Sequence, residues 1–469
     1  MPIDRFRPRR PFRAPALRVW ATALLTTTFA AALNAQTATP SIAFEKFTLP
    51  NGLEIIMHVD KSVPIVAVNT WYKVGSGDEK PGRTGFAHLF EHVMFMGSKN
   101  VPVGKFDQWL EGAGAQNNGS TTEDRTNYYE TGPSNALALM LWLDADRMGW
   151  LLPTMDKPKL DLQRDVVKNE RRERVENQPY GRVEELILPV MFPKNHPYSW
   201  SVIGSMTDLS NASVEDVSEF FRKYYAPNNA SIAIAGDIDP KEVKKLAIKY
   251  FGEVPRNPDA PVRPTVPPAA LTKDTIMVME DRVQLPRLHY IWHGVKAFSA
   301  DEPAIDALAE IIAGGKSSRL FKSMVYEKQI AQDVGMSNQS GKLDGTIWLT
   351  ATAKPGKTAQ SLAAEFDAVI AKIATEGITE RELNQVKNGV RAGLLDETSS
   401  VLGKADKLNE YNYMVGNPDY LAADLARYEK LTAADVQRVA KNYVVGKPRI
   451  ILTVVPEGKK NLAFVGGAQ

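Results

Sequence analysis

The chain has 469 residues, 43% hydrophobic and 24% charged, so it is long enough for two or more hydrophobic cores and large-scale disorder is excluded. Its formal net charge is +2, and no run of Lys and Arg interleaved with aromatics occurs in the body of the chain, so we expect no nucleic-acid partner. Cysteine is absent, which excludes disulfides, thiolate metal ligands and a cysteine nucleophile. Any metal must be held by His and carboxylate side chains.

Residues 1–35 are typical of a secretory signal peptide. A basic cluster from Arg5 to Arg18 precedes an apolar stretch, Val19 to Ala32, and small residues continue to Ala35. The apolar stretch is short for a membrane span. We therefore expect cleavage near Ala35 and a periplasmic or secreted protein that has no membrane attachment after cleavage. A retained N-terminal anchor is the alternative.

Residues 42–254 are expected to form a first domain that combines strands with amphipathic helices. Strand segments are predicted at 45–58, interrupted by the turn Asn51–Gly52, at 63–74 and at 230–236. Helices are predicted at 85–97, 135–148, 156–176, 213–225 and 240–251.

Residues 255–273 carry six prolines and are expected to be an extended linker, because proline suits neither a helix interior nor a central strand. Beyond it, residues 274–460 loosely repeat the order of the first domain. Strands are predicted at 275–280, 288–295, 345–353 and 449–455, and helices at 303–313, 317–327, 358–376, 379–396, 404–413 and 433–443. The expected fold is α+β, with two homologous half-domains that each pack helices on a mainly antiparallel sheet.

The pattern His88-Leu89-Phe90-Glu91-His92 is the strongest chemical signal in the chain. Residues four apart lie on one face of a helix, so both imidazoles can bind one Zn²⁺ while Glu91 points into the same space. This H-x-x-E-H order is the inverted form of the H-E-x-x-H zinc-protease motif, in which the glutamate is the general base. Two solvated or core histidines on a helix are the alternative.

A catalytic zinc usually takes three protein ligands, so a third partner is required. Glu170 is the candidate, because Val166, Val167 and Glu170 lie at i, i+1 and i+4 and place this carboxylate on the buried edge of the helix expected at 156–176. An ion pair with a neighbouring Arg is the alternative role for Glu170.

Nearly all of the chain after the signal resembles the inverted-zincin metallopeptidases that include pitrilysin, insulin-degrading enzyme and the mitochondrial processing peptidase. Besides His88–His92, the resemblance rests on residues 112–128, 166–181, 196–198, 225–237 and 314–327. It implies that His88, His92 and Glu170 bind one Zn²⁺ per chain and that Glu91 is the base of a metalloendopeptidase. His₂Glu ligation also admits Mn²⁺ and Co²⁺.

The resemblance further implies that Asn118, Gly119, Ser120 and Thr121 form an edge strand beside the zinc, which binds an extended peptide by main-chain pairing. An ordinary turn in a Gly/Asn-rich loop is the alternative. Many relatives carry a second glutamate seven residues before the ligand glutamate. Gln163 stands there, and we expect it to keep a hydrogen-bonding role behind the metal ligands.

The second half departs from complete enzymes of the family, which follow S-R-L-F with an Arg and then a Tyr that reach the substrate. Aligned on Ser318–Phe321, Val325 and Gln332 occupy those positions. The chain therefore resembles the zinc-bearing subunit of a bacterial two-chain member, and we expect a heterodimer with a homologous non-zinc subunit that supplies the Arg and Tyr. A homodimer, or an enzyme that acts alone, is the alternative.

A non-catalytic scaffold or binding homologue of the same fold is the rival interpretation. A complete set of ligands and base at His88, Glu91, His92 and Glu170 argues against it, because a scaffold has no physical need for them. A metal-dependent hydrolase for non-peptide substrates has no support beyond the zinc motif itself.

Overall fold

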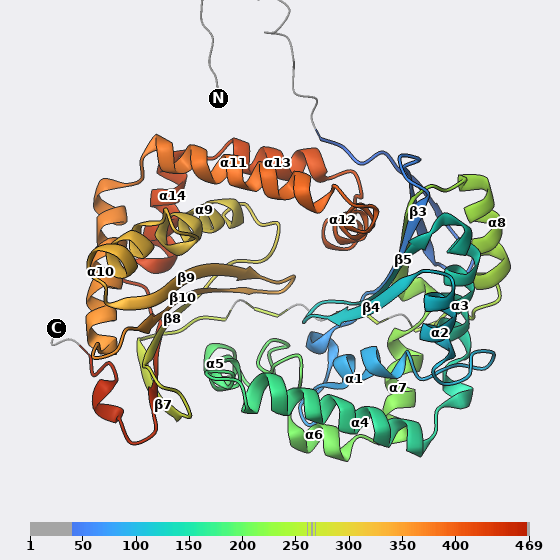
Figure 1. The fold of residues 1–469 in the computed structure, drawn as a ribbon, viewed down its shortest axis with the longest axis horizontal. Coiled ribbons are helices and arrows are strands. Elements are labelled where there is room, and N and C mark those ends of the chain that lie inside the picture. The colour runs from blue at the N-terminus through green and yellow to red at the C-terminus, as the bar shows by residue number, and fades with distance from the viewer. Residues whose placement is uncertain (1–39, 260, 264–265, 268, 467–469) are drawn as a thin grey trace, which may run out of the picture. The chain divides into compact units, whose positions relative to one another are not determined.

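The computed structural model describes residues 40–259, 261–263, 266–267 and 269–466, which form an α+β fold with two sheets (Figure 1). The signal peptide expected at residues 1–35 lies outside the described residues. Within the described ranges, no helix has both the length and the apolar character needed to cross a membrane.

The first sheet has six strands in the spatial order β1-β2-β6-β3-β5-β4. Neighbouring strands are antiparallel except for β2 and β6, which are parallel. Because β4 lies at one edge, one side of this strand has no neighbour in the sheet. The strands are β1 (Glu45–Thr48), β2 (Glu54–Val59), β3 (Ile65–Tyr72), β4 (Gln116–Thr121), β5 (Thr126–Pro133) and β6 (Ala230–Gly236).

One face of this sheet is buried by helices of the same half. Ile55, Val66 and Val68 share a single hydrophobic cluster with Phe90 and Leu141 from two of those helices. The helices of the first half are α1 (Phe86–Val93), α2 (Lys105–Gly112), α3 (Leu137–Trp150), α4 (Lys157–Arg171), α5 (Val183–Met191), α6 (Met206–Asn211), α7 (Val214–Tyr224) and α8 (Pro240–Phe251), and a π-helical turn, Arg172–Glu176, continues α4.

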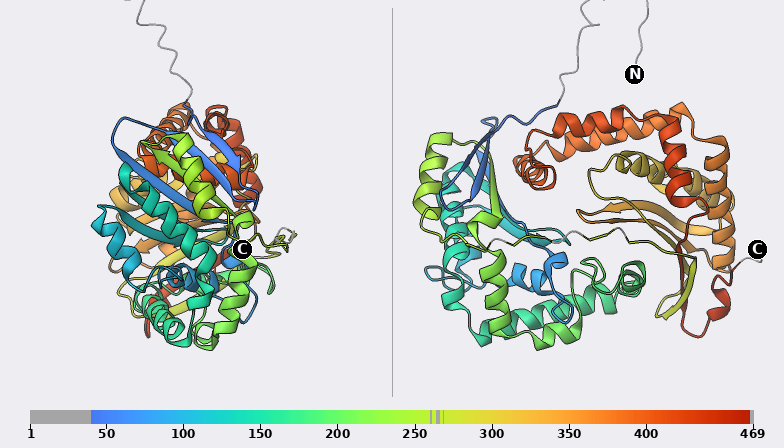
Figure 2. Two further views of the ribbon diagram at one scale, coloured as in Figure 1. Left: turned by 90° about the vertical axis from the view of Figure 1, so that its right-hand side faces the viewer. Right: turned by 180° about the vertical axis from the view of Figure 1, so that it is seen from behind.

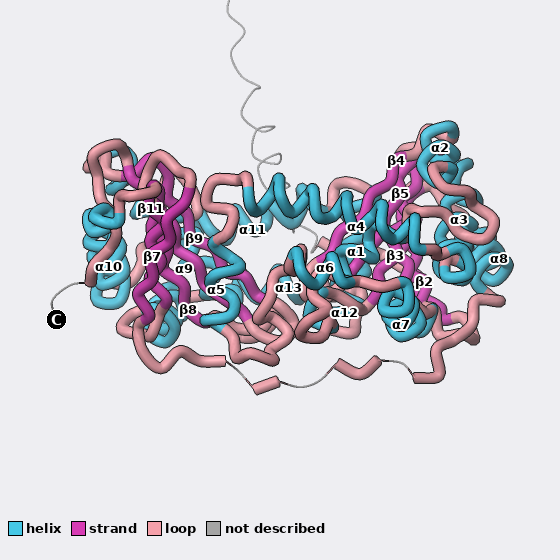
Figure 3. The backbone as a smooth tube through the Cα atoms, turned by 90° about the horizontal axis from the view of Figure 1, so that it is seen from below, coloured by secondary structure: helices cyan, strands magenta, loops and turns pink. Residues whose placement is uncertain are grey.

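The second sheet has the order β7-β11-β8-β10-β9, with β7 and β11 parallel and the other neighbours antiparallel. This is the arrangement of β2-β6-β3-β5-β4 in the first sheet. Figure 3 shows the strands as two separate groups. The strands are β7 (Thr275–Asp281), β8 (Arg287–His293), β9 (Ala331–Ser340), β10 (Gly345–Ala353) and β11 (Ile450–Pro456).

Helices of the second half bury one face of this sheet, where Tyr290, Ile347 and Leu349 cluster with Leu308 and Phe366. The helices are α9 (Glu302–Ala313), α10 (Ala359–Glu376), α11 (Glu380–Glu397), α12 (Val401–Met414), α13 (Leu421–Glu429) and α14 (Ala433–Val439), with π-helical turns at Phe321–Glu327 and Ala440–Val444.

Each half also covers the second face of the other half's sheet. Helix α12 brings Ala405 and Leu408 into a cluster with Ile56, Ala67 and Ala233 of the first sheet. Figures 1 and 2 show α12 beside β3. Helix α5, from the first half, shares a cluster with strands of the second sheet through Val183, Ile187, Ile291, Leu452 and Val454.

Polar side chains complete the α12 contact. Asn409 is fully buried; its amide donates to the backbone carbonyl of Asn69 at 2.7 Å and its carbonyl accepts from the Ser231 hydroxyl at 2.8 Å. Asp406 accepts from the Asn69 amide at 2.9 Å. These hydrogen bonds, together with the burial of Ala405 and Leu408, fix the position of α12 on the sheet.

The α+β class and the mainly antiparallel sheets are confirmed. The sequence patterns missed α2, β5, α5, α6, β9 and α13. The helix predicted at 317–327 is present from Arg319, mainly as the π-helical turn Phe321–Glu327. The described residues between Pro255 and Lys273 contain no helix or strand.

Candidate metal centre

Helix α1 carries His88, Glu91 and His92 and is fixed at its N-terminus by Glu79. The Glu79 carboxylate accepts the backbone N–H of Gly85 at 3.0 Å and of Ala87 at 2.7 Å, two donors that the first turn of a helix cannot satisfy internally. Phe86, Leu89, Phe90 and Val93 are buried in the core of the first half. Since this side of α1 is packed against the core, the H-x-x-E-H side chains lie along the edge that borders a cavity.

Helix α4 supplies Glu170 from its last turn. The helix begins at Lys157 after Asp156, whose side chain accepts the backbone N–H of Lys159 at 2.9 Å. Val167 is fully buried, as predicted, but Val166 is 39% exposed, so the prediction that both lie on the buried edge was half wrong. Glu170 lies at the boundary between the buried and exposed sides.

The three predicted ligands converge. Glu170 Oε2 lies 3.2 Å from His92 Nε2 and 3.6 Å from His88 Nε2, and one ligand atom from each of the three residues lies within 4.8 Å of the others. Among the described residues, this is the one group of three or more His and carboxylate side chains spaced closely enough to share an ion.

The electrostatic surroundings keep this group suited to a cation. Burial and the neighbouring His92 lower the pKa of His88 to about 4, so its imidazole is neutral and can offer a lone pair at neutral pH. The hydrogen bond from His92 lowers the pKa of Glu170 and keeps it a carboxylate. A neutral imidazole at His88 and a carboxylate at Glu170 are therefore available together.

Glu91 lies between the ligands and strand β4. The Thr121 hydroxyl donates to Glu91 Oε2 at 2.6 Å, so one carboxylate oxygen is held by the edge strand. Burial raises the pKa of Glu91. Raising the basicity of a carboxylate increases its ability to accept a proton. Gly119 lies against the same side chain, and a Cβ at this position would be 2.9 Å from Glu91 Cγ.

Strand β4 offers main-chain groups at its open edge. Thr122 N–H donates to Arg125 O at 2.9 Å, so these two residues form a hydrogen-bonded pair. Bonded and non-bonded pairs alternate in an antiparallel ladder, so Ser120 and Asn118 also bond to β5. Gly119 and Thr121 therefore present their N–H and C=O groups to the open edge. The Asn118 side-chain oxygen accepts the Gly119 N–H at 2.8 Å.

Ser120, the remaining predicted residue of this strand, is hydrogen-bonded to residues of the same sheet region. Its hydroxyl donates to the Asn127 side chain at 2.7 Å, and its backbone carbonyl accepts from Arg125 at 2.9 Å. A cavity of about 720 Å³ is lined by all four predicted strand residues, by the three candidate ligands and by Glu91.

The cavity also contains charged residues that the sequence patterns did not identify. Arg174 lies in the π-helical turn after α4, and its Nη1 is 2.6 Å from Glu170 Oε1. It is four residues after the ligand on one helix face, a spacing that could have identified it. Glu123, Glu184 and Glu185 also line the cavity, and burial together with the neighbouring Glu123 raises the pKa of Glu184 to about 7.

Gln163 lies two turns before Glu170 on α4, and its amide donates to the Met96 sulfur at 2.8 Å. In the second half, Val325 is half-buried against the core and Gln332 is exposed on β9. Neither position offers a guanidinium or a phenol.

Two family models match the chain. One, described as "Insulinase (Peptidase family M16)", matches residues 54–203, and the other, described as "Peptidase M16 inactive domain", matches residues 211–390. The Zinc protease PqqE of Helicobacter pylori is 30% identical over 428 residues, which cover 90% of this chain and 94% of that protein. A probable mitochondrial-processing peptidase subunit beta of Arabidopsis thaliana is 22% identical over 87% of this chain and 78% of its own length.

Solved structures share the fold. The crystal structure of a protease from Helicobacter pylori superposes with a TM-score of 0.83 at 28% identity, over 89% of this chain and 100% of that one. The periplasmic protease PqqL from Escherichia coli superposes with a TM-score of 0.72 at 19% identity, over 88% of this chain but 47% of its own. His88, Glu91, His92 and Glu170 all lie in the part that matches the insulinase model.

Proposed function

The chain belongs to peptidase family M16, the insulinase family, and on this premise we propose that it is the catalytic subunit of a zinc-dependent endopeptidase that hydrolyses extended peptides. The observation that carries the proposal is the convergence of His88, His92 and Glu170 on one point beside Glu91. Relatives named zinc proteases support the choice of metal.

The donor set fits one Zn²⁺. Donor atoms about 2.1 Å from a shared tetrahedral ion lie roughly 3.4 Å apart. The separations of 3.2 and 3.6 Å between Glu170 and the two imidazoles bracket that value, and all three ligand atoms lie within 4.8 Å of one another. His88, His92 and Glu170 would hold the ion, which when bound supplies Lewis-acid polarisation of the scissile carbonyl and acidifies the attacking water.

Glu91 performs the proton transfers. Its carboxylate, oriented by Thr121, accepts a proton from the attacking water and later delivers it to the leaving amine. The raised pKa of Glu91 suits both directions of transfer, because the residue must hold the proton between the two steps.

Strand β4 holds the substrate. The outward N–H and C=O groups of Gly119 and Thr121 pair with an extended peptide, which displaces the Asn118 side chain from the Gly119 N–H. Main-chain pairing is insensitive to side-chain identity, so this mode of binding gives broad specificity. It also places the peptide beside Glu91, because Gly119 packs directly on that residue.

We propose further that the chain works with a homologous subunit that lacks the zinc motif and contributes an Arg and a Tyr. Val325 and Gln332 leave this chain without those groups. The PqqL structure, in which this fold covers 47% of the chain, supports an arrangement of two such units. A periplasmic or secreted location follows from the signal peptide expected at residues 1–35.

Glu91→Gln tests the proposal. The variant should keep one zinc per chain, measured by elemental analysis, and lose at least about 100-fold in turnover of an unstructured peptide. His88→Ala should lose both zinc and turnover. Assays of the chain alone and mixed with its homologous partner test the two-subunit form. Cleavage by Glu91→Gln at the normal rate would remove Glu91 from its role.

A non-catalytic role is the second candidate, since the second half matches a model described as inactive. That match begins at residue 211, so no residue of the candidate metal centre lies within the matched region. A chain that binds zinc and peptide but never cleaves, alone or with its partner, would favour this candidate.

A further inference from the structure

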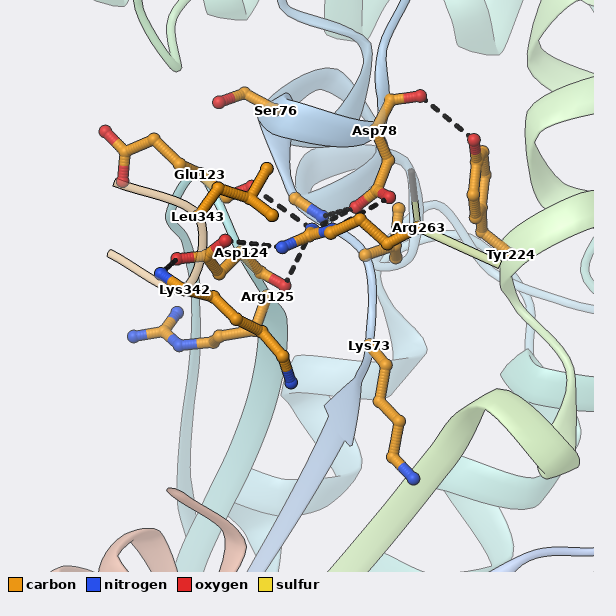
Figure 4. Close-up of polar contacts among 12 residues, drawn as sticks. Lys73, Ser76, Asp78, Glu123, Asp124, Arg125, Tyr224, Arg263, Lys342 and Leu343 are labelled. Carbon is orange, nitrogen blue, oxygen red and sulfur yellow. Dashed lines mark hydrogen bonds and ion pairs between the residues drawn. The ribbon is translucent and has the colours of Figure 1, made fainter. Parts of the chain in front are cut away.

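The turn between β4 and β5 is held by ion pairs and hydrogen bonds to charged side chains (Figure 4). It comprises residues 122–125 and directly follows Thr121, which orients Glu91. Thr122 and Glu123 line the metal cavity, whereas the side chain of Asp124 is buried. The position of this turn therefore sets the end of the strand on which a peptide would pair.

Arg263, in the segment that joins the two halves, binds this turn. Its guanidinium forms ion pairs with Asp124 and with Asp78, and its Nη2 also donates to the backbone carbonyl of Asp124 at 3.3 Å. The side chains are 13%, 10% and 8% exposed for Arg263, Asp124 and Asp78, so the three charges are shielded from water. A planar fork of donors suits two carboxylates at once.

Asp78 belongs to the segment that precedes helix α1, and this segment is bonded to the same turn. Ser76 N–H donates to Thr122 O at 3.0 Å and Gly77 N–H donates to Glu123 O at 2.9 Å. Arg263 thus closes a ring in which the turn, the segment before α1 and the linker hold one another.

The second half of the chain reaches Asp124 from the other side. The backbone N–H of Lys342 donates to Asp124 Oδ2 at 2.8 Å, and the Tyr413 hydroxyl donates to the Asp124 carbonyl at 3.0 Å. The Tyr198 hydroxyl donates to Asp124 Oδ1 at 2.7 Å and accepts the N–H of Leu343 at 3.0 Å. Arg263 pairs with the same Asp124 carboxylate that accepts from Lys342 and Tyr198.

We infer that Arg263 is a positioning residue for substrate: by pairing with Asp78 and Asp124 it fixes the β4–β5 turn, and with it the strand on which a peptide pairs beside Glu91. The inference rests on the proposed function in naming a peptide as substrate. If Arg263 has this role, the linker contributes to substrate binding and does more than connect the two halves.

The test compares Arg263→Gln and Arg263→Lys with a matched control, Arg256→Gln, which changes an exposed arginine of the same linker. We expect amide hydrogen exchange at residues 116–125 to rise about 10-fold in Arg263→Gln, with exchange in the second sheet unchanged. The KM for an unstructured peptide should rise about 10-fold with kcat within about two-fold, because pairing is weakened while Glu91 and the ligands remain. Zinc content should stay at the wild-type value.

Arg263→Lys should give hydrogen exchange at residues 116–125 and a KM between those of wild type and Arg263→Gln. Lysine keeps the positive charge but lacks the planar set of donors that binds two carboxylates at once. Arg263→Lys also keeps the test decisive if Arg263→Gln fails to fold. Unchanged exchange at residues 116–125, an equal rise throughout the chain, or a fall in kcat at constant KM would each overturn the inference. A wild-type chain that cleaves no peptide would overturn the proposed function instead, and exchange in the Arg263 variants would still decide whether this residue positions β4.

Discussion

Gly119 and Glu91 are in such close contact that the open-edge strand and the H-x-x-E-H helix leave no room for a side chain between them. A Cβ at residue 119 would lie 2.9 Å from Glu91 Cγ and 3.3 Å from Glu91 Cδ. The approach of β4 to the carboxylate therefore depends on glycine, although the backbone at this position is not in the left-handed region.

Gly119→Ala should reduce kcat/KM by about 100-fold, because a displacement of the order of 1 Å at a reacting group has that effect. Steady-state kinetics on an unstructured peptide measures it, and zinc content should remain normal. The control is Gly112→Ala, at the end of α2, where a Cβ meets nothing within 4 Å. Equal activity of the two variants would contradict the proposed geometry.

Thr121→Val should reduce kcat about 10-fold, because it removes one hydrogen bond to a charged carboxylate. The Thr121 hydroxyl is the donor to Glu91 Oε2, and valine has the same shape without it. Thr121→Ser keeps the donor and should retain most of the activity. If serine is as damaging as valine, the effect lies in packing and the orienting role of the hydroxyl is wrong.

Glu184→Gln should stabilise the protein at pH 8 and have little effect at pH 4. The pKa of Glu184 is raised to about 7 by burial and the neighbouring Glu123, so the folded state binds its proton more tightly than the unfolded state does. This contribution to stability is complete below the unfolded pKa and is lost as the pH rises through 7.

Because the Glu184 side chain is exposed and lines the cavity, solvent screens its charge, and the gain at pH 8 should be about 1 kcal/mol or less. Thermal unfolding at both pH values measures it, with Glu111→Gln on the exposed side of α2 as the control. A Glu184→Gln variant that is less stable than wild type at pH 8 would show that the carboxylate has a stabilising partner there.

Arg147→Met should lower the free energy of unfolding by about 3–5 kcal/mol, because it leaves two buried carboxylates without their cation. Arg147 is 2% exposed; it pairs with Glu130 at 2.8 Å and with Asp144, both fully buried. The denaturant midpoint measures the loss. Arg222→Met, which breaks an exposed pair with Glu215, should change it by less than about 1 kcal/mol.

The convergence of the candidate metal ligands could be predicted from the sequence because their signals are local. His88, Glu91 and His92 lie within five residues on one helix, and Glu170 lies in a helix with a clear cap and apolar positions. The wrong placement of Val166 shows the limit: helical periodicity gives the face, but the width of the buried stripe depends on what packs there.

The missed elements depend on tertiary contacts. Strand β9 (Ala331–Ser340) lacks a pattern of β-branched residues and forms because β10 pairs along it. Helix α5 contains Pro189, which argues against a helix in sequence, yet Val183 and Ile187 are buried against the second sheet. Arg263 and Asp124 are 139 positions apart, and no local pattern joins them.

Helices α5 and α12 cross over so that each half shields the other's sheet, and this has a consequence for expression of fragments. A fragment ending near residue 254 would contain every metal ligand, yet it would expose Ile56, Ala67 and Ala233 to solvent and leave Asn69 and Ser231 without Asn409. Such a fragment should aggregate when produced alone, and co-production with residues 274–460 as a second chain should rescue it.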